Sequence, residues 1–246
     1  MKKLLILVLL IFFAGFYRLY AQSGVTHDAF SRLLKQHVGK NGDVNYKGFI
    51  KDSTQLNAYL KQLSANPPQN SWSTNDQLAY WINAYNAYTI QLIIRNYPLK
   101  SIKDIGSLIK IPFVNTPWDI KFIRIGKNTY DLNNIEHDIL RKKFNEPRIH
   151  FAIVCASVSC PKLLNEAYVG ARINQQLEAQ AKDFINDPTR NKVTPAKAEL
   201  SSIFSWFKGD FTKKGSLNDF INKYAEVKLR PNAKISYLDY NWNLNE

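Results

Sequence analysis

The sequence predicts one α+β domain in which helices outnumber strands. Residues 75–95 run without glycine or proline and carry apolar side chains on more than one face, which is typical of a helix at the centre of a domain. Shorter amphipathic helices and a few strand-like stretches surround this segment along the chain. We expect a small, mainly antiparallel sheet to pack on this helix, built from residues 118–125, 129–132, 149–156 and 235–242.

The first 21 residues resemble a secretory signal peptide. Two lysines precede the apolar run 4–13, and a polar stretch follows Ala21. We therefore expect an exported protein, periplasmic or extracellular, with one globular domain over residues 22–246. Leu19 stands where a small residue is usual before a cleavage site, so an uncleaved anchor is the alternative. The apolar run is shorter than the ~18 residues of a membrane span, so we expect no stable membrane insertion after cleavage.

The chain is strongly basic. It contains 33 Lys and Arg against 20 Asp and Glu, a net charge of +13. Residues 1–21 hold three basic and no acidic residues, so their removal leaves 30 minus 20, or +10. Outside the cytoplasm this charge favours an anionic envelope component as partner, with an ordinary solvated surface as the alternative. The lysines are scattered and not interleaved with aromatics, so we expect no nucleic-acid partner.

The central helix is preceded by two amphipathic helices, at residues 26–38 and 53–63. Thr74 is its predicted N-cap, because Gln77 completes a capping-box pattern three residues later. Within it, Asn83 and Asn86 lie one turn apart on a common edge. A buried amide needs hydrogen-bond partners, so these side chains either bond neighbouring backbone groups or line a cleft and orient a base or a substrate amide.

Alternating apolar and charged residues predict the strand 118–125, paired as a hairpin with 129–132. A short helix over 135–141 follows, with Glu136 in its first turn, where a carboxylate is favoured. Further helices are expected at 173–185, 201–207 and 217–224, before the edge strand 235–242.

The stretch 148–161 contains both cysteines and one of the four histidines. Its apolar run 151–156, followed by small polar residues and a proline, predicts a buried strand with a site at its C-terminal rim. Side chains alternate along a strand, so His150 and Cys155 would face opposite sides. We therefore expect His150 to lie nearer to Cys160 than to Cys155, because the turn 156–159 can return Cys160 to the side of the strand that His150 faces.

Cys160 is the candidate nucleophile. Pro161 suits the first position of a helix that residues 162–168 can continue, which would leave Cys160 at the helix N-terminus. Free backbone N–H groups and the positive end of the helix dipole lower the pKa of a thiol there. A Cys155–Cys160 disulfide is the alternative, although it would close a very short loop and be a weak, reducible staple.

The histidines and cysteines do not have the spacing of known zinc sites. A set of His150, Cys155, Cys160 and His137 lacks the pairs of closely spaced ligands that such sites use. We expect neither a metal nor a cofactor.

Six motifs occur in one order along the chain. They are Trp81-Ile82-Asn83-Ala84-Tyr85-Asn86-Ala87, Tyr97-Pro98-x-x-Ser101-Ile102, Ile135-Glu136-His137-x-Ile139-Leu140-Arg141, Arg148-Ile149-His150-Phe151-Ala152, Cys155-Ala156-Ser157-x-Ser159-Cys160-Pro161 and Leu200-Ser201-x-Ile203-Phe204-x-Trp206-Phe207-x-x-Asp210-Phe211. Together, over about residues 27–225, they resemble the domain of unknown function 547 family, here as a secreted bacterial member. The resemblance implies homology and a shared site at the matching His and Cys positions, without an established activity.

A central helix followed by a strand carrying His also loosely resembles the papain-like and transglutaminase-like thiol enzymes. Those enzymes place the nucleophile at the start of the central helix, and here that helix contains no cysteine. Either the thiol comes from elsewhere, as Cys160 would, or the likeness concerns the fold alone.

The leading hypothesis is a secreted thiol-dependent hydrolase or acyl transferase that acts on an amide or thioester. Cys160 would be the nucleophile, His150 the general base, and the orienting group one of Asn83, Asn86 and Glu136.

Two other classes stay open. A non-catalytic envelope binding module would use the Cys155–Cys160 pair as a structural disulfide. A thiol–disulfide redox protein would exchange the same pair reversibly, although it usually has the Cys-x-x-Cys spacing that is missing here. The sequence predicts neither the substrate nor the oligomeric state.

Overall fold

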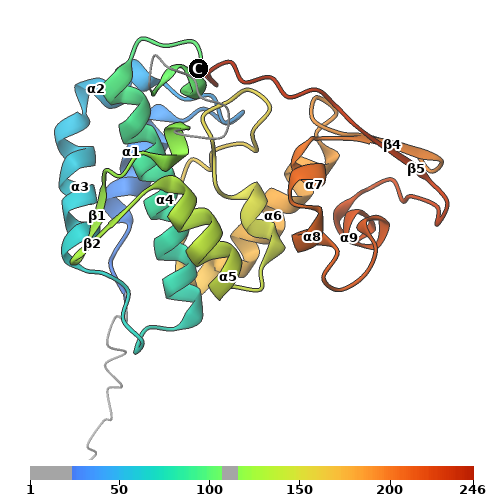
Figure 1. Cartoon of the computed structure of the whole chain (residues 1–246), viewed down its shortest axis with the longest axis horizontal. Coiled ribbons are helices and arrows are strands. Elements are labelled where there is room, and N and C mark those ends of the chain that lie inside the picture. Colours follow the sequence, from blue (N-terminus) through green and yellow to red (C-terminus); the bar gives the residue numbers. More distant parts are fainter. Residues whose placement is uncertain (1–23, 107–115) are drawn as a thin grey trace, which may run out of the picture.

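A computed structural model describes residues 24–106 and 116–246 (Figure 1). The predicted signal peptide lies outside the described residues. Within them the chain is helix-rich, with two small, mostly antiparallel sheets. The α+β class is confirmed, and the prediction of a single sheet is corrected to two. No helix in these two ranges is long and apolar enough to cross a bilayer.

The central helix is α4 (Thr74–Asn96), and every side chain from Leu78 to Ile93 is buried. Its N-cap is Ser73, one residue before the predicted cap, and the Ser73 hydroxyl accepts a hydrogen bond from the Asp76 backbone N–H at 3.1 Å. Serine and threonine both cap helices well, so the sequence alone does not choose between neighbouring positions.

One layer of helices and the first sheet cover α4 (Figure 1, blue to green). The helices are α1 (Asp28–His37), α2 (Tyr46–Lys51) and α3 (Ser53–Ala65). The first sheet is the antiparallel hairpin of β1 (Ile123–Ile125) and β2 (Asn128–Tyr130). The predicted strand at 118–125 starts late, because Pro117–Asp119 forms a 3₁₀ turn (η2) with a capping box between Thr116 and Asp119.

The C-terminal half forms a second layer around the other sheet (Figure 1, orange to red). In that sheet β4 (Lys197–Leu200) pairs antiparallel with β3 (Lys192–Val193) and parallel with β5 (Lys234–Tyr237). The helices of this half are α6 (Ile173–Asn186), α7 (Ile203–Trp206), α8 (Lys208–Phe211) and α9 (Leu217–Tyr224). The predicted helix 201–207 is present as the short helix α7, and a second short helix, α8, follows it.

Short helical turns connect the two layers. The predicted helix 135–141 is the π-helix η3 (Asn134–Leu140) that runs into α5 (Arg141–Lys143). The remaining 3₁₀ turns are η1 (Ile102–Asp104), η4 (Pro147–Phe151) and η5 (Gly170–Arg172).

The predicted strand at 149–156 is wrong. Pro147 opens the 3₁₀ turn η4, the Glu146 side chain caps it by accepting from the Arg148 N–H at 3.1 Å, and irregular backbone follows. A short apolar run predicts a buried strand and a buried helical turn equally well, and here the proline and its cap decide. Ile149 belongs to the hydrophobic cluster around α4, and Phe151 to a second cluster around α6 to α9. His150 therefore lies at the junction of the two clusters.

Candidate active site

A cavity of about 200 Å³ opens at this junction. His150, Cys155, Cys160 and Glu136 all line it. The rest of its wall is largely aromatic, from Tyr85, Trp118, Trp206, Phe207, Tyr240 and Trp242. An apolar cavity with a few convergent polar groups is the usual form of a small-molecule site.

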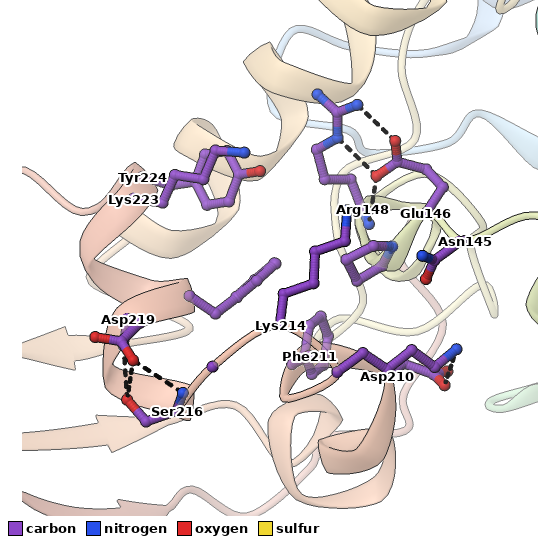
Figure 2. A pocket seen from close by; sticks show the side chains of 14 residues that line it. Asn145, Glu146, Arg148, Asp210, Phe211, Lys214, Ser216, Asp219, Lys223 and Tyr224 are labelled. Carbon is purple, nitrogen blue, oxygen red and sulfur yellow. Dashed lines mark hydrogen bonds and ion pairs between the residues drawn. The ribbon is translucent and has the colours of Figure 1, made fainter.

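A second cavity, of about 320 Å³, is lined mostly by polar and charged residues (Figure 2). Arg148 pairs there with Glu146 at 2.5 Å, and Ser216 exchanges cap hydrogen bonds with Asp219 at the start of α9. Asp210 forms part of this wall and also reaches His150. No cysteine or histidine of the described chain lines this cavity. Both cysteines and His150 therefore lie in the smaller one.

The two cysteines are brought together by the turn at 156–159. Ala156 has a φ of 59°, in the left-handed region that residues with a Cβ adopt rarely and at a cost. Both thiols are free, their sulfur atoms lie 2.7 Å apart, and the Cys155 N–H donates to the Cys160 sulfur at 2.9 Å. Such strain persists only where surrounding structure holds it in place, and it clusters at functional sites.

The C-terminal segment supplies part of that surrounding structure. It returns across the molecule from β5 towards α2 (Figure 1), and its Asn243 carbonyl accepts from the Val158 N–H at 2.8 Å. The Tyr240 hydroxyl lies 3.2 Å from the Cys155 sulfur. From the other side, the Arg190 guanidinium donates to the carbonyls of Cys160 at 2.8 Å and Val158 at 3.0 Å.

The two thiols have opposite acidities. Burial by itself raises the pKa of Cys160 and is the largest single effect, whereas hydrogen bonds from the Cys155 and Tyr240 side chains lower it. Together with the backbone N–H groups of Cys155 and Ser157 they lower the pKa of Cys160 to about 7. Burial, and the neighbouring Cys160 sulfur, raise the pKa of Cys155 well above its ordinary value. The first proton therefore leaves from Cys160, and Cys155 stays protonated as its donor.

Alkylation of Cys160 by iodoacetamide should follow this acidity. The thiolate is the reactive form, so the alkylation rate should rise with pH around a midpoint near 7. Tyr240→Phe removes one donor and should move the midpoint upward. Peptide mapping by mass spectrometry across a pH series measures the rate at each cysteine. A midpoint at the ordinary thiol value of about 8.5 would contradict the assignment.

The predicted helix over 162–168 is absent. The backbone of this segment bonds to side chains from distant helices instead. The Asn83 side chain donates to the Tyr168 carbonyl at 2.7 Å and accepts from the Tyr168 N–H at 2.9 Å. The Gln180 side chain donates to the Lys162 carbonyl at 2.8 Å. These partners replace the bonds that a helix would make. The Cys160 thiolate is therefore stabilised by the N–H groups of its own turn, and not by a helix dipole.

His150 is held firmly in one orientation. Its ring stacks on Phe207 with the ring centroids 3.9 Å apart, and its Nε2 lies 2.8 Å from Asp210 Oδ2. Burial lowers the pKa of His150 although the Asp210 bond opposes this, so the imidazole is neutral at neutral pH. Neutral Nε2–H then donates to the carboxylate, which leaves the lone pair on Nδ1. Nδ1 is buried and has no hydrogen-bond partner among the described residues.

Asp210 is fixed in turn by Arg141. The Arg141 Nε lies 2.6 Å from the same Oδ2 atom, and its NH1 lies 2.9 Å from His137 Nδ1. The hydrogen bonds from His150 and Arg141 hold the pKa of Asp210 well below its usual range, despite partial burial. The carboxylate is thus ionised at any pH of interest and orients His150 through one end of the ring.

Glu136 enters the cavity from the π-helix η3. Its Oε2 accepts a hydrogen bond from the Tyr85 hydroxyl at 3.3 Å. Burial raises the pKa of Glu136 to about 7, with the Tyr85 bond and the Arg141 charge working against that rise. An extra residue in a helical turn, which a π-helix contains, re-aims side chains and is frequent at functional sites.

Asn83 and Asn86 do not line this cavity, and each carboxamide brackets one buried backbone segment. Asn86 donates to the Ala152 carbonyl at 2.9 Å and accepts from the Val154 N–H at 2.9 Å, and Asn83 does the same for Tyr168. These contacts match the structural alternative that the sequence left open. Asn86 fixes the backbone between His150 and Cys155 and so positions the site without touching it.

Asn86→Ala should therefore destabilise the fold. It leaves two buried backbone groups unpaired, which is expected to cost about 3 kcal/mol of unfolding free energy. Asn96→Ala on the same helix is the matched control, because its single bond to the Leu92 carbonyl is near the surface. Urea denaturation compares the two. A variant of native stability that has lost only activity would point to a role for Asn86 inside the site.

Four of the cavity residues were predicted from the sequence, and three residues that hydrogen-bond to the site were not. Cys160, Cys155, His150 and Glu136 come together, but neither thiol is within hydrogen-bonding distance of His150 Nδ1, and which thiol is nearer stays a prediction. The missed partners are Asp210, Arg141 and Tyr240. Asp210 belongs to the motif around Trp206-Phe207, but no role is assigned to it from the sequence. No signal pointed to Tyr240.

Nothing in the described ranges resembles a metal centre. No three His, Cys, Asp or Glu side chains of residues 24–106 and 116–246 are grouped as ligands would be.

Comparison with known proteins finds one match. Residues 69–185 match the family described as "Protein of unknown function, DUF547". No curated protein and no solved structure matches the chain, so the loose likeness to papain-like and transglutaminase-like folds finds no support. The matched segment contains His150, Cys155, Cys160 and Glu136, whereas Asp210 and Tyr240 lie beyond it. Residues 69–185 of this chain are a domain of the DUF547 family.

Proposed function

We propose that this protein is a thiol-dependent hydrolase or acyl transferase, with Cys160 as nucleophile and His150 as base. One observation carries the proposal: an acidic thiol shares an apolar cavity with a histidine that a carboxylate orients and whose Nδ1 has no partner among the described residues. A nucleophile, a base and a group that orients the base are the three parts of an acyl-transfer site. Asp210 takes the orienting role that the sequence assigned to Asn83, Asn86 or Glu136.

The reaction would proceed in two steps. The Cys160 sulfur attacks the carbonyl carbon of an amide or thioester, and its proton passes to His150 Nδ1 and on to the leaving nitrogen or sulfur as that bond breaks. Water or another acyl acceptor then attacks the thioester on Cys160, gives a proton to His150 Nδ1 and restores the thiol. His150 makes no bond to the thiol in the ligand-free protein, so the proton transfer requires a water or a substrate atom between them.

The setting of this reaction is also proposed. The N-terminal resemblance to a signal peptide favours action in the periplasm or outside the cell. There the basic charge of the chain would favour an anionic envelope component as partner.

Turnover by the reduced full-length protein tests the proposal. A panel of short acyl thioesters and acyl amides is incubated with protein kept in a mild reductant, and release of the thiol or amine is followed. Hydrolysis should occur and should stop after treatment with iodoacetamide at pH 7. Absence of turnover across the panel, or turnover that survives alkylation of Cys160, would overturn the proposal.

A thiol–disulfide redox protein is the second candidate, because the two sulfur atoms are in direct contact. A Cys155–Cys160 disulfide would accept two electrons and two protons from a substrate dithiol, which leaves as a disulfide. Cys155→Ser separates the candidates: it abolishes this exchange, and it leaves acyl transfer by Cys160 in place. A binding module with a structural disulfide is distinguished by thiols that resist iodoacetamide until reduced.

A further inference from the structure

The cavity that holds Cys160 has a wall of aromatic side chains and one unpaired carboxyl group. Glu136 is only 7% exposed and forms no ion pair with any described residue, and its single hydrogen bond is the one from Tyr85. A buried carboxyl group in a folded protein normally has a cationic partner. Here the carboxyl group has room for a cationic partner that residues 24–106 and 116–246 do not supply as an ion pair.

The charge around the cavity is opposite to that of the chain as a whole. The chain carries a net charge of +13, yet none of the described residues that line this cavity is Lys or Arg. Its ionisable groups are Glu136, Cys155, Cys160, Tyr85 and Tyr240, which become negative on ionisation, and two histidines. A cationic group in the cavity would meet Glu136 and the Cys160 sulfur.

The aromatic side chains converge from three segments of the chain. Trp118 packs edge-on against Trp242 at 5.8 Å between ring centroids, and Trp242 stacks on Trp206 at 5.7 Å. Trp206 is 49% exposed, so its ring is open to the solvent. The wall already holds one ammonium group, because Lys103 Nζ lies 3.7 Å from the centroid of the Trp242 ring. Aromatic faces attract cations, and tryptophan does so most strongly.

We infer that this cavity binds an ammonium group of the substrate, with Glu136 as its counter-ion and Trp118, Trp206 and Trp242 as its aromatic wall. The ligand class is an amine or quaternary ammonium compound, for which a carboxylate among aromatic rings is the recognised chemistry. The assignment of this group to the substrate rests on the proposed acyl-transfer function. The binding site itself depends only on the geometry of the wall and can be tested without turnover.

Binding of choline by the full-length protein tests the inference, with dimethylbutanol, its uncharged carbon isostere, as the comparison. Isothermal titration should give choline about a 10-fold higher affinity than the isostere, because only choline gains the cation–π and carboxylate attraction. Glu136→Gln keeps an acceptor for the Tyr85 hydroxyl and should remove most of that preference. Trp206→Leu, at a half-exposed position where truncation is tolerated, should weaken both ligands.

Glu226→Gln is the matched control, because it removes the same charge from an exposed glutamate at a different cavity. It should leave both affinities unchanged. Equal affinity for the two ligands, no binding of either, or an unchanged preference in Glu136→Gln overturns the inference. Thioester turnover without a preference for choline would leave the proposed function standing and remove the ammonium site. A preference for choline in a protein whose Cys160 transfers no acyl group would support the ammonium site and overturn the proposed function.

Discussion

Cys160→Ser is expected to lower the rate of acyl transfer at least about a thousandfold, whereas Cys155→Ser should stay within about tenfold of the wild type. The Cys160 thiolate is the nucleophile in this account, and serine at that position has no comparable thiolate. A serine at 155 keeps the backbone N–H that donates to the Cys160 sulfur and supplies a hydroxyl near the place of the lost thiol. Rates are measured on both variants under the same reducing conditions.

Each variant is the control for the other, because both replace a thiol by a hydroxyl in the same turn. Thermal unfolding of each shows that the turn is intact. Equal loss in the two variants would favour the redox reading, in which both sulfur atoms are required. Loss only in Cys155→Ser would reverse the roles of the two thiols.

Asp210→Asn should lower the same rate on the order of a thousandfold. The carboxylate accepts the Nε2–H of His150, and an asparagine can turn its amide towards the ring and favour the wrong tautomer. Asp210 also supports the pKa of His150, so its loss should lower that pKa further and move the acid limb of the pH–rate profile to lower pH. The measurement is the rate across a pH series.

Asp219→Asn is the control for this prediction. It removes a carboxylate from the start of α9, where asparagine still suits a helix terminus. An unshifted pH profile in Asp210→Asn, with a loss of rate that merely follows a loss of stability, would reduce Asp210 to a structural residue. That result would also remove the main support for His150 as the base.

The sequence predicted the features that depend on local chemistry. The central helix follows from a capping serine or threonine and an uninterrupted apolar stretch, and α4 confirms it within one residue of its start. The final helix over 217–224 is also confirmed, and Ser216 is its N-cap. In both cases the deciding contacts join residues three positions apart, so they can be identified from the sequence itself.

The features that the sequence missed depend on distant contacts. The segment after Pro161 could have been a helix, but Asn83 and Gln180 bond its backbone from elsewhere in the fold. The run 151–156 lies between two hydrophobic clusters. A segment that is buried on all sides has an apolar sequence whether it is a strand or a turn, so the pattern does not distinguish them. Asp210 lies 60 residues from His150 along the chain, so no spacing rule connects them.

Mapping of the trapped acyl group tests the central claim most directly. Reduced wild-type protein is mixed with a slowly hydrolysed acyl thioester, stopped in acid, digested and analysed by mass spectrometry. The account predicts one acyl group, on Cys160, that forms faster as the pH rises through 7 and accumulates further in His150→Ala, where its hydrolysis lacks a base. An acyl group on Cys155, or none on either cysteine while substrate is consumed, would contradict it.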